Sequence, residues 1–208
     1  VLPDIARVAG PRLHVVELGS GSGRKTALLL AALQDPVAYT PIEISRAALL
    51  SSIDHLAPAL PEVEMLPVCA DFTRAVAVPT PERTPARRLL FFPGSTLGNF
   101  AEDDAVALLR AMRQTMGRDG LALVGIDLHK DPALIDAESG PYALLNDRST
   151  ATSFDNMLTA LEIVASRGWQ VVSMSTNLTT GGMQVEMYVL VQRVAAPPGD
   201  GTTWPYDL

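Results

Sequence analysis

The sequence is poor in cysteine, in aromatic residues and in positive charge. Of its 208 residues, one is cysteine (Cys69) and 5% are aromatic. A single cysteine excludes an internal disulfide and predicts a reducing, cytoplasmic environment, and we expect Cys69 to fill space at the end of a strand. The 16 basic residues are outnumbered by 23 acidic ones, giving a net charge of -7, which argues against a nucleic-acid partner.

Long apolar runs and clustered histidines are also missing. No run approaches the roughly 20 residues that span a membrane, and the first residues do not have the pattern of a signal peptide, so no membrane partner is expected. His14, His55 and His129 lack the spacing of metal ligands, so no metal site is predicted. Hydrophobic residues, in contrast, make up 48% of the chain, which suits one globular domain with a sizeable core.

Apolar runs typical of strands alternate along the chain with segments of helical spacing. Strands are predicted at 12–18, 37–44, 63–71, 87–94 and 120–128, and helices at 24–35, 45–60 and 101–117. Ser45 is expected to cap the second helix and Gly117 to end the third. The Pro-rich stretch 77–86 predicts a surface loop. The alternation indicates an α/β fold, a mostly parallel Rossmann-like sheet with helices on both faces.

The pattern changes after residue 150. A helix is predicted at 153–168, followed by two strands, "WQVVSMSTNL" and "MQVEMYVLVQR", across a Gly181-Gly182 turn. These strands predict an antiparallel hairpin that closes one edge of the sheet. Residues 195–208 are rich in Pro and Gly and are expected to form a mobile tail, so the domain is predicted to cover 1–194.

The stretch "VELGSGSGRKT" (16–26) follows the first predicted strand and opens a helix. It is not a phosphate-binding P-loop, because that motif needs Lys directly after its second glycine and Arg24 stands there instead. The dinucleotide pattern G-x-G-x-x-G also fails at its third glycine, again because of Arg24. What remains is a strand with the acidic Glu17 near its end, and a Gly-rich turn before a helix.

Acidic and aromatic residues follow the next strands, where open parallel sheets bind ligands. Glu43 ends the second strand, Asp71 and Phe72 follow the third, and "PGSTLGNF" (93–100) follows the fourth. Each has a plain structural alternative: packing for the glycines, solvation for Glu43, a turn cap for Asp71. Found together at one edge, they favour a site for an adenine nucleoside cofactor.

Five segments resemble the histidine Nα-methyltransferase family of ergothioneine biosynthesis: "VELGSGSGRKT", "YTPIEIS", "CADFT", "LFFPGSTLGNF" and "GIDLHKDPALI". The resemblance implies a class I methyltransferase that takes S-adenosylmethionine (SAM) as cofactor and leaves S-adenosylhomocysteine (SAH). It places the turn at Gly19 near the methionine part of SAM and Lys25 on its carboxylate. It places Glu43 on the ribose and Asp71 with Phe72 at the adenine. The full cofactor set that it implies is Glu17, Gly19, Ser20, Gly21, Lys25, Glu43, Ile44, Asp71, Phe72, Gly94 and Ser95.

The resemblance also implies two catalytic contacts, Asn99 at the α-amino group of the substrate and Glu186 at its imidazole. The plain alternative for Asn99 is the N-cap of the helix that follows. The segment after Ile135 is shorter than the corresponding part of the family, which predicts a reduced or missing substrate domain.

The favoured function is therefore a SAM-dependent N-methyltransferase acting on a small amine or amino acid. Two alternatives remain: a SAM-binding module with weak catalysis that regulates or scaffolds a partner, and, less favoured, an NAD-dependent Rossmann oxidoreductase.

Overall fold

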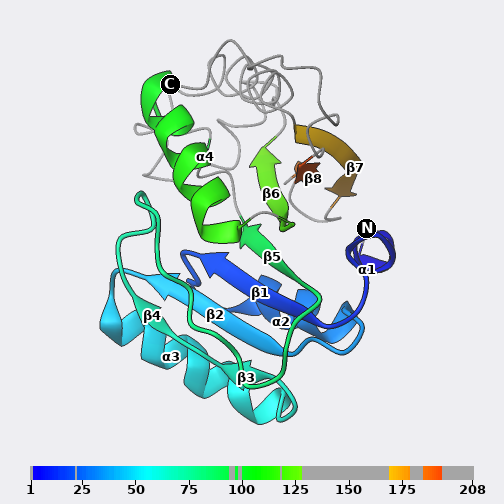
Figure 1. Cartoon of the computed structure of the whole chain (residues 1–208), viewed down its shortest axis with the longest axis vertical. Coiled ribbons are helices and arrows are strands. Elements are labelled where there is room, and N and C mark those ends of the chain that lie inside the picture. The colour runs from blue at the N-terminus through cyan, green and yellow to red at the C-terminus, as the bar shows by residue number, and fades with distance from the viewer. Residues whose placement is uncertain are drawn as a thin grey trace, which may run out of the picture.

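One twisted sheet forms the centre of the computed structural model, which describes residues 2–21, 23–93, 97, 100–117, 119–127, 169–178 and 185–193 (Figure 1). The order of its strands is β3-β2-β1-β5-β6-β8-β7, and β4 also pairs with β2. The strands are β1 (Leu13–Leu18), β2 (Ala38–Glu43), β3 (Glu64–Met65), β4 (Val68–Cys69), β5 (Arg87–Phe92), β6 (Leu121–Asp127), β7 (Trp169–Leu178) and β8 (Val185–Arg193).

The pairing of the strands confirms the predicted Rossmann-like fold class. Every pairing among the strands β1 to β6 is parallel, whereas β8 is antiparallel to both β6 and β7. The chain runs outward from β1 through β2 and returns to β5 on the other side of β1. This reversal between β1 and β5 is the switch point at which open α/β sheets bind their ligands.

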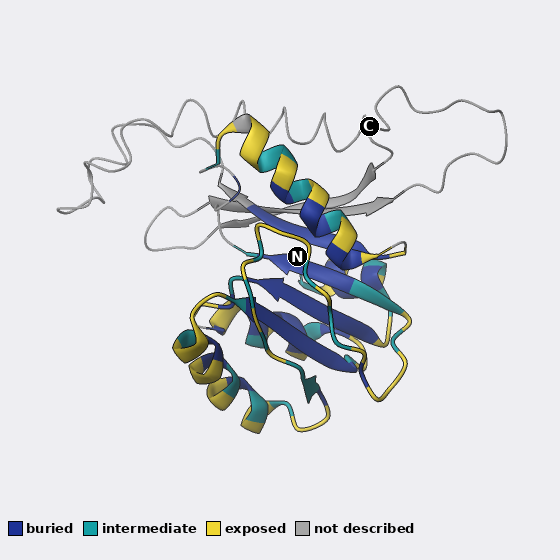
Figure 2. Cartoon of the chain, turned by 60° about the vertical axis from the view of Figure 1, so that its left-hand side comes forward, coloured by how far each residue is buried: buried dark blue, intermediate teal, exposed yellow. Residues whose placement is uncertain are grey.

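Helices cover both faces of the sheet, as predicted. The helices α1 (Leu2–Ala9), α2 (Arg24–Ala32) and α3 (Arg46–Leu56) pack on one face, and α4 (Glu102–Met116) packs on the other. A single 3-10 turn, Ala57–Ala59, extends α3. Figure 2 shows buried strands between helices whose outer surfaces are exposed. Two clusters of buried apolar side chains, one on each face, form the core.

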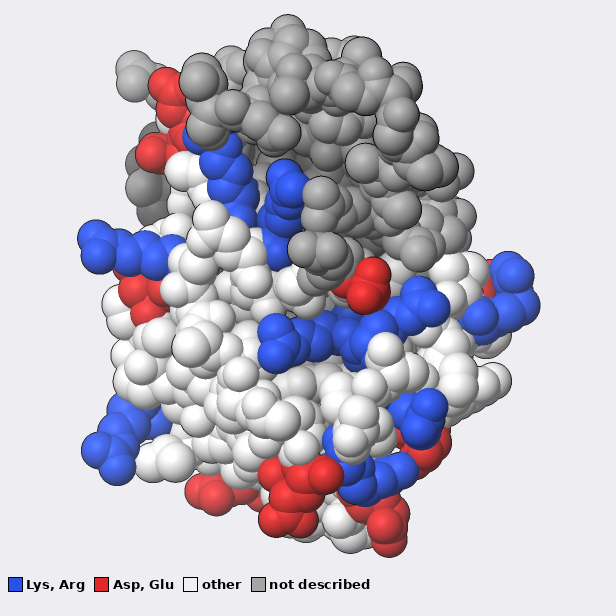
Figure 3. Space-filling model, viewed as in Figure 1, with Lys and Arg blue, Asp and Glu red and all other residues white. Residues whose placement is uncertain are grey.

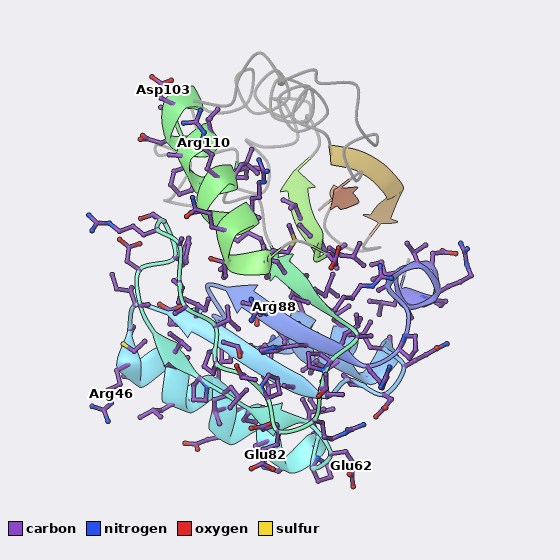
Figure 4. All side chains as sticks on the ribbon, viewed as in Figure 1. Arg46, Glu62, Glu82, Arg88, Asp103 and Arg110 are labelled. Atoms are coloured by element: carbon purple, nitrogen blue, oxygen red, sulfur yellow. The ribbon has the colours of Figure 1, made fainter. Side chains whose placement is uncertain are left out.

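The ends of two helices follow the sequence signals. Ser45 caps α3, because its Oγ accepts a hydrogen bond from Ala48 N at 3.3 Å. Gly117 ends α4 with a φ of 83°. Arg88 stabilises the same end, since its Nη1 donates to Thr115 O at 3.1 Å. Figure 4 shows Arg88 near the central strands, whereas Arg46, Glu62, Glu82, Asp103 and Arg110 lie at the periphery.

Three features differ from the sequence prediction. Helix α1 was not predicted, although it buries Ile5, Ala6 and Ala9 against the core. The third strand is two short pieces separated by Leu66 and Pro67, although Leu66 N still donates to Tyr39 O of β2 at 2.9 Å. Cys69 does end β4 but is exposed, with its Sγ 3.5 Å from Ile44 O, so it does not fill space in the core.

Other predictions fall outside the described residues: the helix at 153–168, the turn at Gly181-Gly182, the tail 195–208 and the shortened segment after Ile135. The loop at 77–86 is free of helix and strand, as predicted.

None of the described helices is both long and apolar enough to cross a membrane. The face shown in Figure 3 carries basic and acidic side chains intermixed with larger uncharged areas.

Candidate cofactor-binding site

The Gly-rich turn lies at the carboxyl end of β1 and is built on left-handed backbone. Gly19, Gly21 and Gly23 have φ values of 72°, 47° and 69°, a region that glycine adopts without strain. Gly19 N donates to Ile42 O at 2.9 Å, which fixes the turn to the end of β2. A Cβ placed at Gly21 would meet no atom within 4 Å. The backbone of the turn is therefore open to close approach by a ligand.

Helix α2 begins directly after this turn. Gly23 is its N-cap residue, so the N–H groups of its first turn have no partner within the helix. Such an N-terminus attracts anionic groups, and Lys25 lies exposed in the same turn. Ser20 is buried, with its Oγ 3.4 Å from Ser52 Oγ of α3. The arrangement suits a carboxylate held at the start of α2.

Glu43 ends β2 at the same edge and is half-buried. Its Oε1 accepts a hydrogen bond from Ser45 N at 3.1 Å, which orients the carboxylate at the start of α3. Ile44 is 69% exposed, and Cys69 stands opposite Glu43 in the pairing of β2 with β4. The structure thus places an oriented acceptor and an exposed apolar side chain next to each other.

Asp71 and Phe72 follow the carboxyl end of β4, at the same edge of the sheet as Glu43 and the Gly-rich turn. Asp71 Oδ1 accepts from Thr73 Oγ1 at 2.7 Å and from Thr73 N at 2.9 Å, and these bonds hold the pKa of Asp71 below its usual range. Asp71 therefore caps the turn at Thr73, which is the plain structural alternative considered for this residue. The ring of Phe72 packs edge to face on Phe92, with centroids 5.8 Å apart at 61°.

Glu17 lies behind the turn and not at its open side. Its side chain is buried on the face of the sheet covered by α2, where Thr26 Oγ1 lies 2.8 and 2.7 Å from its two oxygens. The hydroxyl of Tyr39 donates to Oε2 of Glu17. Burial raises the pKa of Glu17 to about 7, although the hydrogen bonds from Tyr39 and Thr26 act to lower it.

The partners of Glu17 were missed by sequence reasoning. Thr26 stands in the first turn of the helix that follows the Gly-rich turn, and Tyr39 lies in the neighbouring strand. Only the position of Thr26 offered a signal, because a hydroxyl nine residues after a strand-end acid can face it across a strand-turn-helix unit. Tyr39 could be identified only from the register of β1 with β2.

A second buried polar pair lies on the opposite face of β1. His14 Nε2 and Thr40 Oγ1 are 2.8 Å apart, while Nδ1 of His14 has no hydrogen-bond partner among the residues that the structure describes. Burial lowers the pKa of His14 to about 4, with a contribution from the charge of Arg88. The described residues contain no group of three or more His, Cys, Asp or Glu side chains that could hold a metal.

Of the remaining predicted site residues, the structure describes only the backbone of Glu186. Gly94, Ser95 and Asn99 lie outside the described residues, between the end of β5 and Phe100. Ala101, and not Asn99, is the N-cap residue of α4. On the other side of the sheet, Glu186 of β8 pairs with Asp127 at the carboxyl end of β6 and with Asn177 of β7. The backbone thus brings Glu186 to the edge that carries the turn.

Solved structures of methyltransferases share this architecture. The N-methyltransferase NodS from Bradyrhizobium japonicum, solved with SAH, matches with a TM-score of 0.60 at 11% identity, covering 92% of this chain and 83% of that one. The methyltransferase domain of bacterial CtHen1 matches with a TM-score of 0.59 at 12% identity, covering 91% and 93%. At these identities the matches show the fold alone, that of class I methyltransferases.

Curated sequences give a closer relationship. The histidine N-alpha-methyltransferase of Mycolicibacterium smegmatis is 31% identical over 167 residues, which cover 73% of this chain and 50% of that protein. The enzyme of the same name from Mycobacterium tuberculosis is 33% identical over 131 residues, 61% of this chain and 40% of that protein. The chain spans about half or less of these relatives.

The sequence model of one family, described as histidine-specific and SAM-dependent methyltransferase, matches residues 2–159. That span is well over half of the chain and contains the turn, the acidic strand ends and Asn99. The chain belongs to the SAM-dependent, histidine-specific methyltransferase family.

Proposed function

We propose that this chain forms the SAM-binding domain of an N-methyltransferase whose acceptor is the amine of histidine or a similar amino acid. The observation that carries the proposal is the family match over 2–159, which includes every strand of the candidate site up to β6. The geometry supports it, because an open glycine turn, a helix N-terminus and two oriented carboxylates meet at one sheet edge.

The proposed cofactor position follows the order of the strands. The methionine part lies over Gly19, Ser20 and Gly21, with its carboxylate at the start of α2 near Lys25. Glu43 accepts from the ribose hydroxyls, and Ile44 packs beside the adenine. Asp71 and Phe72 hold the adenine from the other side, and Gly94 and Ser95 complete the cradle. Glu17 does not line the cradle and acts on the methionine part of the cofactor from behind the turn.

When bound, SAM would supply an electrophilic methyl group on a sulfonium. Its transfer would form an N–C bond from the lone pair of the amine as the C–S bond breaks, leaving the thioether SAH, and the nitrogen would lose a proton to water. Because the methyl group is already activated, the domain contributes mainly by positioning the amine and excluding water. Asn99 is proposed to orient the amine through its amide, since an amide cannot accept the proton. Glu186 is proposed to bind the imidazole.

Two measurements on the purified protein test the proposal. Titration calorimetry with SAM, SAH and NAD is expected to show binding of the first two only, whereas binding of NAD alone would indicate an oxidoreductase. A methyl-transfer assay over a panel of amino acids is expected to show turnover with histidine. SAM binding without turnover on any acceptor would favour the binding module with weak catalysis.

A cytoplasmic location is proposed as well. It is supported by the exposed free thiol of Cys69, which persists in a reducing compartment.

A further inference from the structure

Three buried side chains join the elements that carry the candidate cofactor site. Glu17 of β1 is 1% exposed, and Thr26 of α2 and Tyr39 of β2 are fully buried. The hydroxyl of Thr26 lies within 2.8 Å of both carboxylate oxygens, and the hydroxyl of Tyr39 donates to one of them. Glu17 stands two residues before Gly19, where the turn begins. The carboxylate is therefore held in one orientation directly behind the turn.

The charge of this carboxylate is not balanced by any cation in the described part of the chain. The ion pairs found there join Arg7 with Asp4 and Arg83 with Asp35. Opposite Glu17 the neighbouring strands present Pro41 and Phe91, and within the described ranges Tyr39 is the one titratable group that contacts it. The other charged or titratable groups of the helices on this face are all exposed: Asp4, Arg7, Arg24, Lys25, Arg46, Asp54 and His55.

We propose that the Glu17 carboxylate is the counter-charge for the sulfonium of the cofactor, and that it makes the site prefer SAM to SAH. This inference rests on the proposed function. SAM carries one positive charge more than SAH, on the sulfur atom. A fixed carboxylate in a poorly solvated position attracts that charge and does little for a neutral thioether.

Proton exchange accompanies this preference. Burial raises the pKa of Glu17 to about 7, so the group is partly protonated at neutral pH before the cofactor binds. Binding of SAM favours the carboxylate and releases the proton to the buffer, whereas SAH has no sulfonium charge to favour it. The preference for SAM over SAH therefore increases as the pH rises through about 7.

The test compares SAM and SAH affinity by calorimetry at pH 6, 7 and 8, in two buffers with different ionisation enthalpies. We expect the ratio of the two affinities to shift toward SAM by at least about threefold between pH 6 and 8, with proton release for SAM only. Glu17→Gln is expected to abolish both the pH dependence and the proton release. Glu64→Gln, a half-buried glutamate at the opposite edge of the sheet, is the matched control and should behave as the wild type.

A second variant covers the case in which Glu17→Gln does not fold. Tyr39→Phe keeps the carboxylate and removes one donor that lowers its pKa, so the transition in the affinity ratio should move to higher pH. An unchanged ratio and profile in Glu17→Gln, or an unmoved transition in Tyr39→Phe, overturns the inference. If the wild type binds neither ligand, the proposed function fails and this inference falls with it.

Discussion

The ring of Phe72 lies against Gly19, so that a Cβ built on this glycine would be 3.6 Å from Cε1 of the ring. The contact brings together two segments that are far apart in the sequence, the turn after β1 and the loop after β4. One of them is proposed to touch the methionine part of the cofactor and the other its adenine. A change at either residue should therefore affect the binding of SAH as a whole.

Gly19→Ala is predicted to weaken SAH binding through the backbone and not through a clash. A separation of 3.6 Å is an ordinary van der Waals contact, but the φ of 72° costs an alanine about 1–2 kcal/mol. Gly10→Ala is the matched control, because Gly10 has a φ of 76° and no atom within 4 Å of an added Cβ. Both variants should lose similar stability in urea unfolding, and only Gly19→Ala should lose SAH affinity. Equal affinities in the two variants would contradict a role for this turn.

Phe72→Leu is predicted to weaken SAH binding by roughly 1–3 kcal/mol, the range observed for stacking of a base on an aromatic ring. Asp71→Asn is predicted to weaken it as well, because one acceptor facing the adenine amine becomes a donor. Calorimetry measures both losses. Thr73→Val serves as the control for Asp71, since it removes a hydroxyl donor to Oδ1 and keeps the carboxylate. A bound structure with the adenine elsewhere would refute both assignments.

Glu43→Ala is predicted to weaken SAM binding by roughly 1–3 kcal/mol, because the ribose hydroxyls lose their acceptor. Glu64→Ala removes a half-buried glutamate from the amino end of β3, away from the site, and should leave SAM affinity unchanged. Equilibrium dialysis with labelled SAM distinguishes the two variants. Wild-type affinity in Glu43→Ala would exclude the ribose role.

Asn99→Asp tests the proposed contact with the substrate amine. The N-cap residue of α4 is Ala101, so capping does not account for Asn99. The substitution places a charge beside the reacting nitrogen and removes the amide donor. We expect SAM affinity and thermal stability to hold while turnover falls at least tenfold, about 1.4 kcal/mol of transition-state stabilisation. Asp103→Asn, which changes an exposed charge in the first turn of α4, should leave turnover unaltered. A loss of turnover below about twofold in Asn99→Asp would rule out the contact.

The buried side chains of His14 and Glu17 are predicted to make the free energy of unfolding depend on pH in opposite directions. The pKa of His14 is lowered from 6.5 to about 4, so its contribution to stability is present above 6.5 and is lost as the pH falls through 4. The pKa of Glu17 is raised from 4.5 to about 7, so its contribution is present below 4.5 and is lost as the pH rises through 7. Glu17→Gln should make the free energy of unfolding rise more steeply between pH 5 and 7. His14→Leu should make it fall over that range. Urea unfolding at pH 5, 6, 7 and 8 measures both slopes, and identical slopes in the wild type and the variants would contradict the assignment.

Much of the fold followed from apolar patterning. The runs that became β1, β2, β5 and β6 are apolar because both faces of a parallel sheet are covered, and turn residues bound them. Helix α1 was missed although its signals are present, with Pro3 and Asp4 at its start and Gly10 after its end. Its eight residues were too short for the apolar spacing to stand out.

The sequence predicted which residues lie at the edge of the candidate site, but not the direction in which the Glu17 side chain points. Glu43, Asp71 and Phe72 were expected at the carboxyl edge because parallel strands all end there, and the structure places them so. The inward direction of Glu17 depends on the alternation of side chains along β1 and on the exact phase of α2. A local motif fixes neither, so the contacts with Thr26 and Tyr39 emerge only in three dimensions.

The division of the third strand at Pro67 has a consequence for behaviour at high concentration. A long exposed edge strand offers a row of unpaired N–H and C=O groups to which another chain can add a strand. The β3–β4 edge offers two pieces of two residues each, interrupted by a residue without an N–H. A foreign strand would find no continuous ladder there. Pro67 thus helps to protect this edge of the sheet against edge-to-edge aggregation, because its missing N–H lies on the open side of the strand.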